Sequence, residues 1–210
     1  MISETYDDAG VSAPHLTIAP RILYFGTPVV LLSTENADGG FNLAPMSSAW
    51  ALGDVVVLGL GPGSQTAANL AERPDLVVNL PGPGQWEAVE RLAPTTGRDP
   101  VPPYKQGVFS YEPDKFGTAG LTEAPSEAVR PPRVRECPLQ LEATVTRLRP
   151  DAGESFLIAE AKVLRVHAAE DIVVPGTSHV DPARWSPLIY NFRHYFGLGS
   201  RLGRTFRAEY

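Results

Sequence analysis

One pair of segments constrains the fold of this chain more than any other. In residues 139–148 apolar and polar side chains alternate, with Leu139, Leu141, Ala143 and Val145 on one face and Gln140, Glu142, Thr144 and Thr146 on the other. Residues 156–167 show a similar pattern, and a turn sequence at 151–154 separates the two segments. Alternation with a period of two is typical of a half-buried strand. The segments therefore predict an antiparallel hairpin with one face exposed to water.

Further strands and short helices are predicted along the chain. β-branched and aromatic residues favour strands at 22–34, interrupted at 26–28, and at 76–80. The turn sequence 36–40 folds the chain back through 41–50. The run 55–60 is wholly apolar, so we expect a strand buried on both faces. Helices are expected at 66–73 after a cap at Ser64 or Gln65, at 85–92, and at 113–120 with a proline near its first turn.

The order of these elements indicates the fold class. It is not a regular alternation of strands and helices, so a doubly wound parallel sheet is not favoured. We expect a mainly β protein with short helices, built as a Greek-key antiparallel barrel. Residues 1–20 are polar and read as an N-terminal arm, and residues 21–210 as one domain.

Charge and apolar run length limit the partners. The net charge of −6 argues against nucleic acid as the main partner, because phosphate binding needs a basic face. Arg201, Arg204 and Arg207 form a local basic tail that we interpret as solvated surface. No apolar run approaches the roughly 20 residues of a membrane span, and the N-terminus lacks the features of a signal peptide. We therefore expect a cytoplasmic protein that does not bind a membrane.

Cysteine and histidine usage gives no metal site. Cys137 is the single cysteine, so a Cys-based metal site and an intramolecular disulfide are excluded. It stands in an apolar run, and we expect a buried, inert thiol. His179 and Asp181 could share one strand face, but no third ligand is evident.

Two small polar loops suit an anionic ligand group. They are residues 42–48 and 61–66, and the apolar run 55–60 lies between them. A helix is predicted directly after the second loop, and a helix start carries free N–H donors and partial positive charge. A phosphate would fit such a site.

A dinucleotide-binding turn is the alternative for the second loop. The spacing fails, because the third glycine of G-x-G-x-x-G after Gly59 and Gly61 would have to be residue 64, which is Ser64. Pro62 also removes a backbone donor that a pyrophosphate would need. We set this interpretation aside.

Four segments, in this order, resemble the flavin reductase-like, FMN-binding split β-barrel family. They are NLAPMSSAWAL from residue 42, SQTAANL from 64, DKFGTAGLTEA from 114 followed by ECPLQLEATV from 136, and WSPLIYNFRHYFGLGSRLG from 185. The resemblance spans about residues 20–210. It implies a split β-barrel that forms a homodimer, with one FMN in each of two clefts at the subunit interface.

The resemblance also implies which residues hold the cofactor. The flavin ring and ribityl chain would be lined by Asn42, Ala44, Met46, Ser47, Ser48 and Trp50. The phosphate would be held by Ser64, Gln65, Thr66 and Asn69. Many relatives add a lysine or arginine in the phosphate loop, whereas residues 42–72 contain neither. The positive charge would then come from Arg73 or from an arginine of a partner subunit.

The aromatic C-terminal segment YNFRHYF allows two interpretations. In the first, its side chains pack on the core or form the dimer contact. In the second, Arg193, His194 and Tyr195 face the cleft. Arg193 would then contact an anionic group, and His194 would act as a catalytic proton donor near neutral pH.

For function, the resemblance implies an FMN-dependent oxidoreductase of the flavin reductase type. NADH, NADPH or another donor would supply electrons for a flavin or another small-molecule acceptor. The alternatives are a non-catalytic FMN-binding carrier or sensor, and a split barrel with other chemistry. FMN is favoured over FAD because no second nucleotide-binding motif is found. Hydrolase chemistry has no support, since G-x-S-x-G is absent and no serine is partnered with His and Asp.

Overall fold

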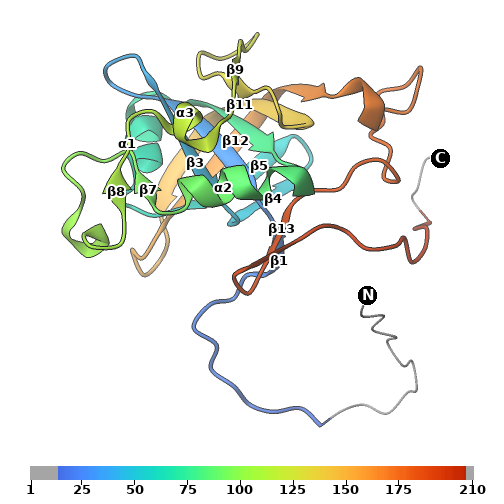
Figure 1. Cartoon of the computed structure of the whole chain (residues 1–210), viewed down its shortest axis with the longest axis horizontal. Helices are drawn as coiled ribbons and strands as arrows, with labels where there is room; N and C mark the ends of the chain where they lie inside the picture. Colours follow the sequence, from blue (N-terminus) through green and yellow to red (C-terminus); the bar gives the residue numbers. More distant parts are fainter. Residues whose placement is uncertain (1–13, 207–210) are drawn as a thin grey trace.

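The computed structural model describes residues 14–206, and its centre is a seven-stranded antiparallel sheet with the order β3-β2-β6-β11-β12-β5-β4 (Figure 1). The strands are β2 Val30–Glu35, β3 Phe41–Met46, β4 Ala49–Leu52, β5 Val55–Leu60, β6 Asp75–Leu80, β11 Leu139–Pro150 and β12 Leu157–Ala168. The edge strands β3 and β4 are joined only by Ser47 and Ser48. The sheet therefore curls and brings its two edge strands to one seam, and beside it the Gly59 N–H donates to the Ser48 carbonyl at 2.8 Å as a continuation of the pairing of β4 with β5. This curled antiparallel sheet confirms the predicted mainly β fold class.

Three smaller sheets surround the large one in the described residues. β1 Phe25–Pro28 pairs with β13 Ile189–Asn191, which pairs with β14 His194–Phe196. β9 Glu123–Ala124 pairs with β10 Arg133–Val134, and β7 Thr95–Thr96 lies parallel to β8 Ser110–Tyr111. The first predicted strand is thus two strands that separate at Val29, and not at 26–28. Gly26 instead adopts φ +93° inside β1, where the pairing register shifts.

Short helices cover the sheet, with α2 and α3 on one of its faces (Figure 1). The α-helices are α1 Gln65–Glu72, α2 Trp86–Leu92 and α3 Lys115–Ala119, and the 3-10 helices are Pro83–Gln85, Pro103–Lys105 and Glu170–Ile172. The side chain of Ser64 caps α1 by accepting from the Ala67 N–H, which confirms the predicted start. Asp114 caps α3, so Pro113 precedes the cap and does not lie in the first turn. No helix within residues 14–206 is long and apolar enough to span a membrane.

The core has two parts, one on each face of β2. Leu32 packs inside the curl with Leu58, Leu76 and Val78. Leu31 points the other way, into a cluster beneath α2 and α3 that includes Leu43, Val89, Leu92 and Phe116. On β5 only alternate residues are buried, namely Val56, Leu58 and Leu60. The expectation that β5 is buried on both faces is therefore wrong, and its second face borders an apolar surface concavity.

The long hairpin of β11 and β12 is confirmed, but its polar face is not wholly exposed. Gln140 and Glu142 are 6 % and 0 % exposed, because the segment 125–134 covers them. The Glu142 carboxylate accepts from the backbone N–H groups of the segment at Glu127, Ala128 and Val129. These donors replace water, so a charged residue on the predicted wet face is buried without losing its hydrogen bonds.

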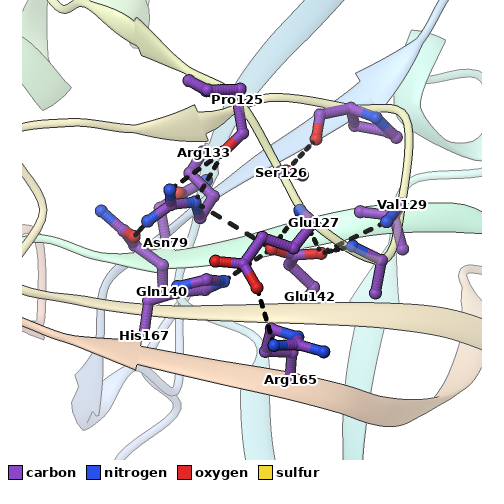
Figure 2. A network of polar contacts seen from close by, with 12 residues as sticks. Asn79, Pro125, Ser126, Glu127, Val129, Arg133, Gln140, Glu142, Arg165 and His167 are labelled. Atoms are coloured by element: carbon purple, nitrogen blue, oxygen red, sulfur yellow. Dashed lines mark hydrogen bonds and ion pairs between the residues drawn. The ribbon is translucent and has the colours of Figure 1, made fainter.

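Further side chains complete this network (Figure 2). Nε2 of His167, which lies on β12, is 2.6 Å from Oε1 of Glu142, and Nε of Arg133 is 4.0 Å from the same oxygen. Arg133 also donates to the Gln140 side chain at 2.8 Å, while Arg165 pairs with Glu127 at 2.7 Å. The covering segment is thus fixed to both strands of the hairpin.

Two predicted features extend beyond the described residues. Residues 1–13 of the expected N-terminal arm, together with Arg207 and Tyr210 of the tail, lie outside the described part of the chain. Residues 14–20 are exposed and form no helix or strand. The division into an arm and one domain stays a prediction.

Candidate functional site

A cavity of about 310 Å³ lies where β3, the start of α1 and the segment 92–115 meet. β3 contributes Asn42, Ala44, Pro45 and Met46, and the seam contributes Ser48 and Gly59. The start of α1 contributes Gly61, Ser64, Gln65 and Thr66. The third wall includes Thr95, Thr96, Gly97, Lys105, Phe109 and Lys115. Tyr24, Leu92 and Ala93 complete the lining.

Most of the predicted site residues come together here. The cavity gathers Asn42, Ala44, Met46, Ser48, Ser64, Gln65 and Thr66. Ser47 and Trp50 instead line the apolar concavity beside β4 and β5. Arg193 and His194 are exposed at the turn between β13 and β14, and neither lines this cavity. Their assignment to the cofactor or to catalysis stays a prediction.

Asn69 lies buried beneath the cavity and positions other side chains. Its side-chain nitrogen donates to Thr34 Oγ1 at 3.0 Å and to Asn36 Oδ1 at 2.9 Å. Its oxygen accepts from Gln65 Nε2 at 2.8 Å. Asn69 does not line the cavity, but it holds Gln65, which does.

The polar wall is arranged to donate hydrogen bonds. Asn42 Nδ2 donates to Thr66 Oγ1 at 3.2 Å, so the hydroxyl proton of Thr66 is left free to point elsewhere. Thr66 lies in the first turn of α1, which carries no acidic residue. The first N–H groups of a helix have no partner within the helix and carry partial positive charge. This wall therefore favours an anion.

Two lysines supply the positive charge that the loops themselves lack. Lys115 is 3 % exposed, and its Nζ donates to Thr95 Oγ1 at 2.5 Å. Burial lowers the pKa of Lys115 to about 8, although Glu112 acts against this shift. Burial and the nearby Arg98 also lower the pKa of Lys105. An anion bound in the cavity would favour the protonated form of both amines.

The lysines were missed in the sequence, and the expected source of charge was different. Arg73 donates its Nε proton to the Glu35 carbonyl at 3.0 Å and is not in the cavity lining. Lys115 lies in the segment DKFGTAG, where the capping Asp114 marks a helix start. That cap is a local signal for α3, but nothing local shows that the helix delivers Lys115 to the cavity.

The cavity lining thus combines two kinds of chemistry. It holds hydroxyls, the start of a helix and two amines, and it also holds Ala44, Pro45 and Met46 of an edge strand. An elongated ligand with a phosphate at one end fits this arrangement. Among residues 14–206 no three or more His, Cys, Asp and Glu side chains gather as metal ligands would.

The curled antiparallel sheet is shared with a putative flavin reductase with a split barrel domain from Shewanella frigidimarina NCIMB 400, which superposes with a TM-score of 0.67 at 17% identity over 87% of each chain. A family model described as "Flavin reductase like domain" matches residues 22–199, and the chain belongs to that family. The family places the chain among flavin-related oxidoreductases.

Individual proteins are similar to this chain over most of its length. The protein YdfE of Bacillus subtilis (strain 168) is 48% identical over 194 residues, which cover 91% of this chain and 93% of that protein. Flavoredoxin of Desulfovibrio vulgaris (Miyazaki F) superposes with a TM-score of 0.76 at 20% identity, covering 93% of this chain and 99% of its own. Nitrilotriacetate monooxygenase component B from Bacillus cereus superposes with a TM-score of 0.72 at 20% identity, and the match covers 92% of this chain and 100% of that chain. The two structures show the shared fold.

Proposed function

We propose that this chain is an FMN-dependent oxidoreductase of the flavin reductase type, with NADH or NADPH as electron donor and a small molecule as acceptor. One observation carries the assignment of a phosphorylated flavin. Lys105 and Lys115 line the same cavity as the start of α1, and that lining contains no carboxylate among the described residues. The residues present therefore fit the phosphate of FMN.

The residues would divide the work of binding. Lys115, Lys105 and the Thr66 hydroxyl would hold the phosphate, and Asn42 would orient Thr66. The ribityl chain and ring would extend along β3, where Pro45 removes one backbone donor and Met46 presents an apolar surface. Phe109 and Tyr24 would limit the access of water. When bound, FMN supplies the hydride and electron transfer itself, and the protein contributes orientation and electrostatics.

The proposal includes a homodimer. An apolar concavity of about 810 Å³ shares Ser48 and Gly59 with the candidate site. Around it Phe25, Trp50 and Leu52 are 74 %, 60 % and 76 % exposed, which is a large apolar area for a free surface. Thr27 and Arg149 also line this concavity, and among the described residues their Oγ1 and Nε atoms are buried without a hydrogen-bond partner. A second copy would cover this face and reach the cofactor.

The roles of Arg193 and His194 depend on that second copy. Both are exposed and lie outside the cavity of their own chain. For Arg193 to contact the cofactor, or His194 to transfer a proton, the turn between β13 and β14 would have to face the site of the partner subunit. The cytoplasmic location expected from the sequence also stays a prediction.

The visible spectrum of the purified protein tests the cofactor and the activity separately. We expect a yellow protein that contains FMN, or that takes it up, and that is bleached under anaerobic conditions by NADH or NADPH. A colourless protein that takes up no FMN contradicts the cofactor assignment. Retention of FMN without bleaching by either nucleotide contradicts the reductase activity and favours the carrier or sensor.

A further inference from the structure

A second cavity, of about 380 Å³, adjoins the candidate flavin site. Tyr24, Pro45, Met46, Ala93 and Phe109 line both cavities. The second one, which we call the aromatic cavity, is completed by Val29, Ser47, Val89, Tyr190 and Tyr195. A ligand in it would therefore lie next to a ligand on β3.

Four aromatic rings form the walls of this cavity, and the C-terminal hairpin supplies two of them. Tyr190 and Tyr195 are opposite each other on β13 and β14, with ring centroids 5.5 Å apart. Tyr24 meets Tyr190 edge to face at 5.4 Å, and Phe109 is part of the lining of both cavities. Such rings offer flat apolar faces and lose little conformational freedom on binding, so they suit a planar ring.

One tyrosine of this cavity is fixed by a carboxylate that is not part of the cavity lining. The Tyr195 hydroxyl donates to Glu90 Oε2 at 2.9 Å, which holds the ring against α2. Burial and Glu90 together raise the pKa of Tyr195, so the wall stays uncharged. Trp86 packs against the outer side of the same ring at 6.3 Å.

The charges of the two cavities differ. Lys105 and Lys115 face the first cavity, whereas the described residues that line the aromatic cavity include no lysine, arginine or histidine. An anion would gain nothing in the aromatic cavity and would lose its hydration. An uncharged ring would gain contact with four aromatic side chains.

We propose that the aromatic cavity binds the uncharged planar aromatic ring of the second substrate, next to the flavin. This inference rests on the proposed function, because it places the flavin in the first cavity. The C-terminal hairpin then contributes to the site through Tyr190 and Tyr195.

Calorimetry with two matched probes tests the proposal on the FMN-loaded protein. We expect 2-naphthol to bind, and naphthalene-2-sulfonate, which has the same ring and a negative charge, to bind at least about tenfold more weakly. Tyr190→Leu removes one wall and should weaken 2-naphthol binding about three- to tenfold, with FMN affinity changed less than twofold. Tyr111→Leu removes an exposed tyrosine outside the cavity and is the control.

A second measurement needs no variant. In the wild-type protein with tyrosine selectively labelled, we expect nuclear Overhauser contacts between 2-naphthol protons and the rings of Tyr190 and Tyr195. Their absence, or equal binding of the sulfonate, overturns the proposal. If Tyr190→Leu weakens the binding of FMN and of 2-naphthol equally, the proposal is also overturned, since the flavin would then occupy the aromatic cavity. If the wild type takes up no FMN, the proposed function is contradicted. If the wild type takes up FMN but does not bind 2-naphthol, only the proposal for the aromatic cavity is contradicted.

Discussion

In the proposed site, Lys115 would attract the phosphate only while its amine is protonated. Because burial lowers its pKa to about 8, this amine starts to lose its proton at mildly alkaline pH. A bound dianion favours the charged amine and raises that pKa in the complex. FMN affinity should therefore be full below about pH 8, fall as pH rises above the pKa of the free protein, and level off above the pKa of the complex.

Fluorescence titrations with FMN at a series of pH values measure this dependence. Lys115→Met should weaken FMN binding about 10- to 100-fold at pH 7, because a hydrogen bond to a charged group is worth about 1.5–3 kcal/mol. The FMN affinity of this variant should also depend less on pH. Riboflavin lacks the phosphate and serves as the control ligand. An FMN affinity that is constant between pH 7 and pH 9.5 in the wild type would show that Lys115 does not hold the phosphate.

Glu142 presents the opposite case, a buried carboxylate that is kept ionised. Burial opposes ionisation, but the N–H donors of Glu127 and Ala128, together with His167, outweigh it and lower the pKa of Glu142. Glu142→Gln replaces the acceptor by a group that brings its own N–H donors. We expect the free energy of unfolding at pH 7 to fall by about 2–4 kcal/mol, measured by urea denaturation.

The pH dependence of this loss has a defined sign. Because the pKa of Glu142 is lower in the folded state, its ionised carboxylate stabilises the fold fully at pH values above 4.5, the pKa in the unfolded chain. This stabilisation is lost as the pH falls through the pKa of the folded state. The difference between wild type and Glu142→Gln should therefore shrink below pH 4.5. The exposed Glu123 is a matched control, and Glu123→Gln should change stability by less than about 0.5 kcal/mol. An effect of Glu142→Gln no larger than that of the control would contradict the network of Figure 2.

The local sequence predicts some residues of the candidate site and not others. Asn42, Ser64 and Thr66 stand in short polar loops beside an apolar strand and a helix start, so local pattern indicates them. Lys105 and Lys115 reach the same cavity from a proline-rich segment and a different helix. Their convergence is a property of the tertiary fold and has no local signal.

At the scale of elements, the segment around Gly97 crosses very close to β3 and α1. A Cβ at this position would lie 2.5 Å from Asn42 Oδ1 and 3.1 Å from Gln65 Cγ. Gly97→Ala should therefore push the Asn42 amide away from Thr66 and weaken FMN binding. We also expect the free energy of unfolding to fall by about 1–3 kcal/mol, as for other overpacked sites.

Binding titrations and denaturation of the same variant measure both effects. Gly84→Ala is the control, because a Cβ at Gly84 meets no atom within 4 Å. If Gly97→Ala binds FMN as tightly as this control does, the close crossing has no part in the site.

Elements with local signals were predicted well, and those that depend on distant segments were not. The hairpin of β11 and β12 follows from its alternation, and α1 follows from its Ser64 cap. The expected exposure of Gln140 and Glu142 was wrong because the segment 125–134, which covers them, leaves no trace in the periodicity of β11.

At the scale of the whole molecule, the apolar concavity beside β4 predicts a dimer. Leu52→Glu places a charge on this face and leaves the core intact, because Leu52 is 76 % exposed. We expect the variant to have half the mass of the wild type by light scattering, and to bind FMN more weakly because the site adjoins this face. Val108→Glu, at an equally exposed apolar residue elsewhere, should remain dimeric. A wild type that is already monomeric at micromolar concentration would contradict the prediction.

The seam between β3 and β4 also governs how the molecule forms and comes apart. The pairs β2–β3, β4–β5 and β11–β12 join neighbours in the chain, whereas β5, which ends at Leu60, pairs with β12, which begins at Leu157. Pairing over long stretches of chain is slow, because loop-closure entropy is lost before the contacts form. β5 contributes Gly59 to the cavity, so the cavity is complete only after β5 has docked and FMN would bind only to the finished barrel. It should therefore slow unfolding and leave the rate of folding unchanged.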